Sequence, residues 1–166
     1  MAFEGVVFKF GDNINTDFII SGRYKFSITD MKQLAQHIFE DIRPHFYKEV
    51  IPQRSIIAAG INFGLGSSRE QAPWVIKETG ILCVIAKSFA RIFYRNAFNI
   101  GLPLIEADTE GLTEKDMISV DIKKGMINNQ NKEQRISFSP FDAFRQDLIH
   151  YGGIIAYLKK FGGFKL

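Results

Sequence analysis

Cysteine is almost absent from this chain of 166 residues, which contains only Cys83. A single cysteine cannot form a disulfide within the chain, and by itself it cannot supply the thiolates that hold an iron–sulfur cluster. Cys83 lies in the apolar run of residues 81–86, where a thiol packs as a small hydrophobic side chain. His37 and His45 have no cysteine or acidic partner at the spacing of a metal site. We therefore expect no metal ligands in this chain.

A large excess of charge and long apolar stretches are also missing. The formal net charge is +3, and no block of lysines and arginines concentrates it, which argues against a nucleic-acid partner. No segment approaches the roughly 20 apolar residues of a membrane span. The first residues lack the basic and then apolar pattern of a secretory signal. These absences predict a cytoplasmic protein without a membrane partner.

The rest of the composition is ordinary for a globular protein, with 46% apolar and 23% charged residues. A chain of this length can bury a sizeable core. It contains no internal repeat, low-complexity tract or linker, and most of its phenylalanines fall on predicted core faces. We expect residues 1–166 to form a single domain.

Apolar patterning predicts strands that alternate with helices over the first two thirds of the chain. The expected strands are residues 3–10, 56–59, 81–86 and 102–105, and the expected helices are residues 30–42, 73–78 and 89–97. Residues 21–28 should form a loop, and residues 47–54 a polar connection. Such alternation indicates crossover connections and therefore parallel strands.

The last third of the chain changes character. Short alternating segments at residues 117–122, 126–130 and 135–137 indicate a small antiparallel patch. Ser139 and Pro140 have the pattern of a helix start, and the pair Gly152 and Gly153 should separate that helix from a terminal one at residues 154–160. In the predicted helix 89–97, one set of side chains should face the core and another should project elsewhere: Phe89, Ile92, Phe93 and Ala97 in the first, Arg91, Arg95 and Asn96 in the second.

The segment GINFGLGSSRE, residues 60–70, lies between a predicted strand and a predicted helix. A glycine-rich turn at such a place leaves backbone N–H groups unpaired and, with the helix dipole, forms a small anion site. The hydroxyls of Ser67 and Ser68 and the guanidinium of Arg69 suit a carboxylate, which arginine can bind through two parallel hydrogen bonds. The alternative is a tight turn with a capping serine.

Other motifs of this general kind do not fit the same segment. A phosphate-binding loop needs Gly-Lys-Ser/Thr, which is absent, and the position that would complete a dinucleotide-binding GxGxxG is Arg69. The nucleophile elbow GxSxG is absent as well. An earlier polar cluster contains Thr16 and Asp17, which by themselves indicate a helix cap or a turn.

Three stretches together resemble a known family: NINTDFIISGRY (13–24), GINFGLGSSREQAPW (60–74) and VIAKSFARIFYRNAFNIGLPLIE (84–106). In order and spacing they are similar to the small subunits of 3-isopropylmalate dehydratase, whose counterpart in aconitases is the swivelling domain. The resemblance covers nearly the whole chain. It implies an α/β fold, a swivelling β/β/α domain with a mixed sheet and flanking helices.

The resemblance also implies an activity and a partner. Such a subunit docks on a separate large subunit that carries a [4Fe-4S] cluster, as a heterodimer or heterotetramer, and is active only in that complex. The implied enzyme is a hydro-lyase that moves the hydroxyl of a small hydroxy-diacid by dehydration and rehydration. The expected reaction interconverts 3-isopropylmalate and 2-isopropylmalate in leucine biosynthesis.

Residue by residue, Ser67 matches the family's catalytic base, and Arg69 matches the guanidinium that holds a substrate carboxylate. Ser68 and Gly66 belong to the same substrate-binding turn. Thr16 and Asp17 match a Thr-Asp pair near the cluster, in which Thr16 is expected to bind substrate and the acid helps to position the departing hydroxyl. Two further family positions, Arg91 and Asn96, are interpreted as structural.

Selectivity in compact members of the family is associated with the loop that contains Arg23, Tyr24, Lys25, Phe26 and Ser27. Homoaconitate-type relatives read Tyr-Leu-Arg-Thr there, and isopropylmalate-specific ones place an aliphatic residue at the third position. This chain reads Tyr-Lys-Phe-Ser and matches neither pattern. Phe26 favours an apolar substituent, because a carboxylate buried beside a phenyl ring lacks a partner. Lys25 could still reach an acid group.

Two alternatives therefore stay open. The chain could belong to a related dehydratase for citramalate, 2,3-dimethylmalate or a homoaconitate-type acid. It could also be a non-catalytic module that binds a carboxylate in the anion site of residues 60–70.

Overall fold

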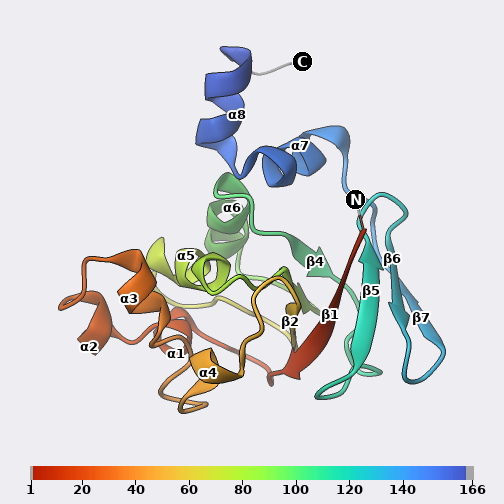
Figure 1. Cartoon of the computed structure of the whole chain (residues 1–166), viewed down its shortest axis with the longest axis horizontal. Coiled ribbons are helices and arrows are strands. Elements are labelled where there is room, and N and C mark those ends of the chain that lie inside the picture. The colour runs from red at the N-terminus through yellow and green to blue at the C-terminus, as the bar shows by residue number, and fades with distance from the viewer. Residues whose placement is uncertain (1, 164–166) are drawn as a thin grey trace.

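The computed structural model describes residues 2–163, which are built around one seven-stranded mixed sheet (Figure 1). The strand order across the sheet is β4-β3-β2-β1-β5-β6-β7. The strands are β1 (Ala2–Lys9), β2 (Ser55–Ala59), β3 (Cys83–Ala86), β4 (Leu104–Glu106), β5 (Met117–Asp121), β6 (Met126–Asn129) and β7 (Gln134–Ser137).

The first four strands are parallel, as the alternation of strands and helices predicted. In the register of the sheet, Val7 of β1 pairs with Ile56 of β2, and Ile57 of β2 pairs with Val84 of β3. Every residue of β2 and β3 is buried. This burial is why both segments read as continuous apolar runs, which is typical of parallel strands covered on both faces.

The last three strands form the predicted antiparallel patch. β5 pairs antiparallel with the outer side of β1, with Phe3 opposite Val120, and β6 and β7 follow as successive hairpins. Ile118 and Val120 are buried while their neighbours along β5 are partly exposed, so one face of this part packs on the core.

The helices cluster away from the antiparallel patch (Figure 1). α1 to α4 gather at the left of the view, α5 and α6 lie in the middle, and α7 and α8 project at the top. Their bounds are α1 (Thr16–Ile19), α2 (Gly22–Lys25), α3 (Met31–Ala35), α4 (Phe46–Glu49), α5 (Gln71–Glu78), α6 (Arg91–Asn99), α7 (Ala143–Tyr151) and α8 (Ile154–Phe161).

The predicted long helix at residues 30–42 is wrong, because only Met31–Ala35 is helical. The chain then passes through turns in which Phe39 adopts a positive φ of 54° and donates its backbone N–H to the Ile19 carbonyl. Ile38 and Phe39 are nevertheless fully buried, and the Phe39 ring lies 4.3 Å from that of Phe10. The apolar period therefore predicted the burial of Ile38 and Phe39 correctly, although the backbone is not a helix, but Ile42 at the end of the predicted stripe is 38% exposed.

Several other boundaries also differ from the sequence prediction. The predicted loop at residues 21–28 contains the short helix α2, and the predicted polar connection contains part of α4. The pattern at Ser139 and Pro140 does not start a helix, because α7 begins later, where the Asp142 carboxylate accepts the backbone N–H of Arg145 at 2.8 Å. Gly152 and Gly153 do separate α7 from α8, with Gly152 at a φ of 81°.

Cys83 lies in the core as predicted and is fully buried. Its removal from water raises the pKa of the thiol far above the usual range, so this cysteine stays protonated. Within residues 2–163, none of the helices is both long and apolar enough to cross a membrane.

Candidate active site

The loops that follow β1, β2 and β3 meet at one edge of the sheet. Parallel strands end at the same edge, and open α/β sheets bind ligands there. Two isolated bridges tie these loops together, one between Asn15 and Leu65 and one between Phe63 and Phe89. The three sequence stretches that carry the family resemblance therefore come together in space.

The glycines of the central turn allow this close approach. Gly64 has a φ of 81°, and a Cβ added there would lie 2.2 Å from Cγ of Phe93. Gly66 has a φ of 99°, which also favours glycine. A Cβ added to Gly66 would lie 3.5 Å from Oγ1 of Thr16, so the turn packs directly against the start of α1.

Thr16 and Asp17 do not cap α1, which corrects the simplest interpretation of that cluster. The cap is Asn15, whose side-chain oxygen accepts the backbone N–H of Phe18 at 2.8 Å. The buried Thr16 donates its hydroxyl to the Ser67 carbonyl at 3.0 Å. Asp17 forms an ion pair with Arg69.

The Arg69 guanidinium is held in place by residues of the early stretch. Its Nη1 donates to the Ile20 carbonyl at 3.0 Å and pairs with Asp17, and the Arg69 side chain is only 13% exposed. The other terminal nitrogen, Nη2, has no hydrogen-bond partner among residues 2–163. One nitrogen therefore fixes the side chain while the other stays available to a ligand.

The hydroxyls and backbone N–H groups of Ser67 and Ser68 are unpaired with respect to the described residues. Both side chains are exposed. α5 begins only at Gln71, and its N-cap, Glu70, makes no capping hydrogen bond with its side chain. The alternative interpretation of a capping serine is therefore wrong. Pro73 lies in the first turn of α5, where its missing N–H costs nothing, as predicted.

This turn forms one wall of a hollow of about 680 Å³. The outer face of α6 forms another wall, with Arg91, Arg95 and Asn96 projecting from the core as predicted. Ile92 was predicted to pack in the core, but it is 46% exposed and lines the hollow. Arg95 was not predicted to belong to the site. The spacing of Arg91 and Arg95 could have indicated it, because residues four apart share one helical face.

The segment that was predicted to set selectivity lies beside this site rather than in the wall of the hollow. Gly22 lies between the selectivity segment and the site. A Cβ added to Gly22 would lie 3.6 Å from the Phe26 ring and 3.9 Å from Nη2 of Arg69. Phe26 is 83% exposed, and Lys25 Nζ lies 5.4 Å from the centre of its ring.

The other members of that segment have contacts of their own. Arg23 pairs with Asp41, and the Tyr24 ring stacks on His37 at 3.9 Å between centroids. The Ser27 hydroxyl donates to the carbonyl of Arg23 at 2.9 Å. These contacts stabilise α2, and a substrate-binding role for Arg23, Tyr24 and Ser27 stays a prediction.

A metal site is not found within residues 2–163, where no three side chains of histidine, cysteine, aspartate or glutamate are grouped as ligands. The hollow instead brings together a serine hydroxyl, a fixed guanidinium and backbone N–H groups that have no partner among residues 2–163. This arrangement can bind a carboxylate and accept a proton beside it.

Comparison with known proteins agrees with this geometry. Residues 44–110, which include the glycine-rich turn and all of α6, match the model of the aconitase C-terminal domain. The chain is 46% identical to the 3-isopropylmalate dehydratase small subunit 2 of Archaeoglobus fulgidus, over the full length of both. It is 48% identical to the 3-isopropylmalate dehydratase small subunit of Halothermothrix orenii, over 99% of each chain.

A solved structure extends the similarity to the fold. The crystal structure of 3-isopropylmalate dehydratase from Methanocaldococcus jannaschii matches with a TM-score of 0.91 and 44% identity, over 96% of this chain and 95% of that one. The β/β/α arrangement expected of a swivelling domain is therefore confirmed. The chain belongs to the family of 3-isopropylmalate dehydratase small subunits, a hydro-lyase family related to the aconitases.

Proposed function

We propose that this chain is the small subunit of a hydro-lyase that interconverts 3-isopropylmalate and 2-isopropylmalate in leucine biosynthesis, as a single domain in the cytoplasm. The observation that carries the proposal is the joining of the Thr16-Asp17 stretch to the Ser67–Arg69 turn by a hydrogen bond and an ion pair. Membership of a family whose relatives are named for this reaction supports it.

The proposed enzyme needs a large subunit, in a heterodimer or heterotetramer, that carries the [4Fe-4S] cluster. The described part of this chain does not fit the cluster, since its one cysteine is buried and protonated and no ligand group is present. In the complex, the cluster would act as a Lewis acid toward the hydroxyl that leaves. Proton removal and substrate binding would depend on side chains of this subunit.

Ser67 would remove the proton from the carbon next to a substrate carboxylate. The hydroxyl leaves from the neighbouring carbon as the double bond forms, and return of water in the opposite sense moves the hydroxyl. A serine hydroxyl is a weak base, so its alkoxide must be stabilised. We expect the N–H groups of Ser67 and Ser68, which have no partner among residues 2–163, and the guanidinium of Arg69 to do so.

Arg69 would bind a carboxylate of the diacid, and Asp17 would contact its hydroxyl. Nη2 of Arg69 is available for a carboxylate, and Ser68 can donate a further hydrogen bond. Asp17, with a side chain 53% exposed, would position the departing hydroxyl. Thr16 would hold the turn through its hydrogen bond to the Ser67 carbonyl.

Phe26 supports an apolar substituent on the substrate, because its ring, which offers a carboxylate no hydrogen bond, lies on the same side of Gly22 as Nη2 of Arg69. A dehydratase for citramalate, 2,3-dimethylmalate or a homoaconitate-type acid is the second candidate, favoured by the position of Lys25 beside that ring. The Ser67 hydroxyl has no hydrogen-bond partner among residues 2–163, which argues against a non-catalytic carboxylate-binding module, since such a module has no need of a base.

The decisive experiment combines this chain with the cluster-bearing large subunit of its organism under anaerobic conditions. Formation of the unsaturated acid is followed for isopropylmalate, citramalate, dimethylmalate and homocitrate in parallel. We expect turnover of isopropylmalate, and faster turnover of another acid would assign the second candidate. A stable complex with an intact cluster and no turnover of any of them would contradict the enzyme proposal.

A further inference from the structure

Arg91 and Arg95 lie one turn apart on the exposed face of α6, and the proposed chemistry uses neither of them. Both side chains are exposed. Neither forms a hydrogen bond or an ion pair within the described part of the chain. They contrast with Arg69, which Asp17 and the Ile20 carbonyl hold in place.

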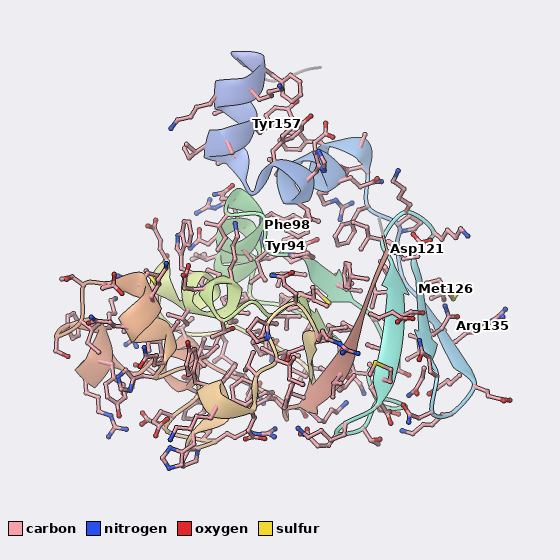
Figure 2. All side chains as sticks on the ribbon, viewed as in Figure 1. Tyr94, Phe98, Asp121, Met126, Arg135 and Tyr157 are labelled. Carbon is pink, nitrogen blue, oxygen red and sulfur yellow. The ribbon has the colours of Figure 1, made fainter. Side chains whose placement is uncertain are left out.

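The helix that carries these two arginines is firmly anchored. Its inner face packs Phe93, Ala97 and Phe98 into the core. Tyr94 lies next to Phe98, with ring centroids 4.9 Å apart, below α7 (Figure 2). The backbone of α6 is therefore held in place by the core, and the guanidiniums of Arg91 and Arg95 project from its outer face.

The hollow beside this face extends from the Ser67–Arg69 turn to Arg95 of α6. A volume of about 680 Å³ lies in the range that encloses a whole drug-sized ligand. Its lining includes three arginines and, among the described residues, no acidic one. Substrate bound at Arg69 would leave the α6 side of the hollow open and positively charged.

Apolar side chains are exposed along the same side of the molecule. Ile92 lies between the two arginines and is 46% exposed. A neighbouring hollow shares Asn96 with the first and is lined by Trp74, 39% exposed, and Ile155, 64% exposed. Arginine and tryptophan are enriched in the centres of protein interfaces, and exposed apolar groups with a polar rim mark such sites.

We propose that Arg91, Ile92 and Arg95 form a docking face, the α6 face, for an acidic segment of the cluster-bearing large subunit. The inference rests on the proposed function for the identity of the partner. Charge complementarity defines the occupant, because two guanidiniums that lose water in an interface need carboxylates opposite them. Ile92 would pack against the apolar part of the same segment.

A second subsite for a substrate carboxylate is the competing explanation of this arginine pair. A small-molecule site has side chains that are held in position by their neighbours, as Arg69 is. Arg91 and Arg95 have no such support among residues 2–163, and exposed guanidiniums of this kind suit a partner that brings its own carboxylates.

The test measures assembly in the absence of substrate. The affinity of this chain for the large subunit is titrated at several salt concentrations, for the wild type and for the double variant Arg91→Gln/Arg95→Gln. We expect the double variant to bind about tenfold or more weakly at low ionic strength and to show a flatter salt dependence. The double variant Arg91→Glu/Arg95→Glu should bind more weakly still.

The matched control is Lys123→Gln/Lys124→Gln, which removes the same charge from the exposed turn between Asp121 and Met126, apart from α6 (Figure 2). This control should assemble like the wild type. Unfolding midpoints of the isolated subunits check that each variant folds, and exposed substitutions should change stability little.

Unchanged affinity of Arg91→Gln/Arg95→Gln would refute the inference, and a raised KM in the same active complex would assign the arginines to substrate instead. Weakened, less salt-dependent assembly supports the α6 face whatever the substrate proves to be. A salt-dependent complex that turns over none of the tested acids would contradict the proposed function but would still support the α6 face as a docking site. Absence of any complex would overturn both.

Discussion

Thr16 and Ser67 are 51 residues apart in the chain, yet the Thr16 hydroxyl donates a hydrogen bond to the Ser67 carbonyl at 3.0 Å. Thr16 is almost fully buried, at 2% exposure, whereas the Ser67 side chain projects into the hollow. A rigid buried residue therefore fixes the backbone from which the proposed base extends. Loss of this bond should affect the reaction without removing any group that contacts substrate.

Thr16→Val keeps the shape of the side chain and removes the hydroxyl, so the Ser67 carbonyl loses its donor. We expect a loss of about 1 kcal/mol of unfolding free energy. We also expect a lower kcat with a smaller change in KM, because the position of the base shifts while Arg69 keeps its supports. Urea unfolding and steady-state kinetics of the reconstituted complex measure both effects.

Thr16→Ser is the control for that variant, since it restores the donor with one methyl group fewer. It should recover most of the kcat. Equal activity of Thr16→Val and the wild type would show that this hydrogen bond does not position Ser67.

Ser67→Ala should leave folding and assembly unchanged, because the side chain is exposed and makes no hydrogen bond within residues 2–163. Turnover in the reconstituted complex should fall by about 10²- to 10⁴-fold, the usual contribution of a positioned base. Ser139→Ala, at an exposed serine that does not line the hollow, is the matched control. Substantial turnover by Ser67→Ala would remove the serine from its proposed role.

Phe26→Arg places a guanidinium near the free nitrogen of Arg69, where a third carboxylate could bind. A charge-assisted hydrogen bond contributes about 1.5–3 kcal/mol. The ratio of kcat/KM for homocitrate to that for isopropylmalate should therefore rise by about 10- to 100-fold. Phe26→Leu, which adds no charge, should keep the wild-type preference. An unchanged ratio in Phe26→Arg would contradict a role of this segment in selectivity.

Asp116 should make the stability of this protein depend on pH. Its side chain is 7% exposed. Burial raises the pKa of its carboxyl, but hydrogen bonds from Thr113, Lys132 and Asn129 outweigh burial and lower the pKa to about 2. An unfolded aspartate has a pKa of about 3.9, so the ionised group stabilises the fold by about 2–3 kcal/mol above that pH.

This contribution should be lost as the pH falls from about 4 through about 2, where the folded carboxyl takes up its proton. The difference in unfolding free energy between the wild type and Asp116→Asn should be largest near pH 7 and shrink below pH 4. Urea titrations at several pH values measure it. Asp108→Asn, with a carboxylate 69% exposed, should show little difference at any pH. A difference for Asp116→Asn that does not vary with pH would contradict the assignment.

The apolar pattern alone was enough to predict which strands are parallel and which are antiparallel, but not the order of the strands across the sheet. The runs at β2 and β3 indicated buried parallel strands, and the alternation at β5 indicated an antiparallel face. Both signals are local, because the side-chain period of a strand shows which of its faces are buried. The glycines at 64 and 66 were likewise recognisable as a special turn, since few other residues adopt positive φ.

Backbone conformation was predicted least well where tertiary contacts override local preference. Phe39 interrupts the expected helix because its N–H pairs with Ile19 and its ring packs on Phe10. Ile19 and Phe10 are both too distant in the sequence for the local apolar pattern around Phe39 to reveal these contacts. Ile92 was assigned to the core for the related reason that a helical period cannot show which apolar position faces a hollow.

The sequence by itself determined the family, the parallel and antiparallel parts of the sheet, and the residue types of the candidate anion site, because each of these depends on short stretches of neighbouring residues. Only the tertiary structure decided that Asn15 caps α1, which leaves Thr16 to hold Ser67 and Asp17 to pair with Arg69. It also decided that Arg91 and Arg95 face the same hollow. The physical reason is that each of these groups forms hydrogen bonds or ion pairs with the partners that lie beside it in the folded chain. Those partners are distant in the sequence, so a local pattern does not reveal them.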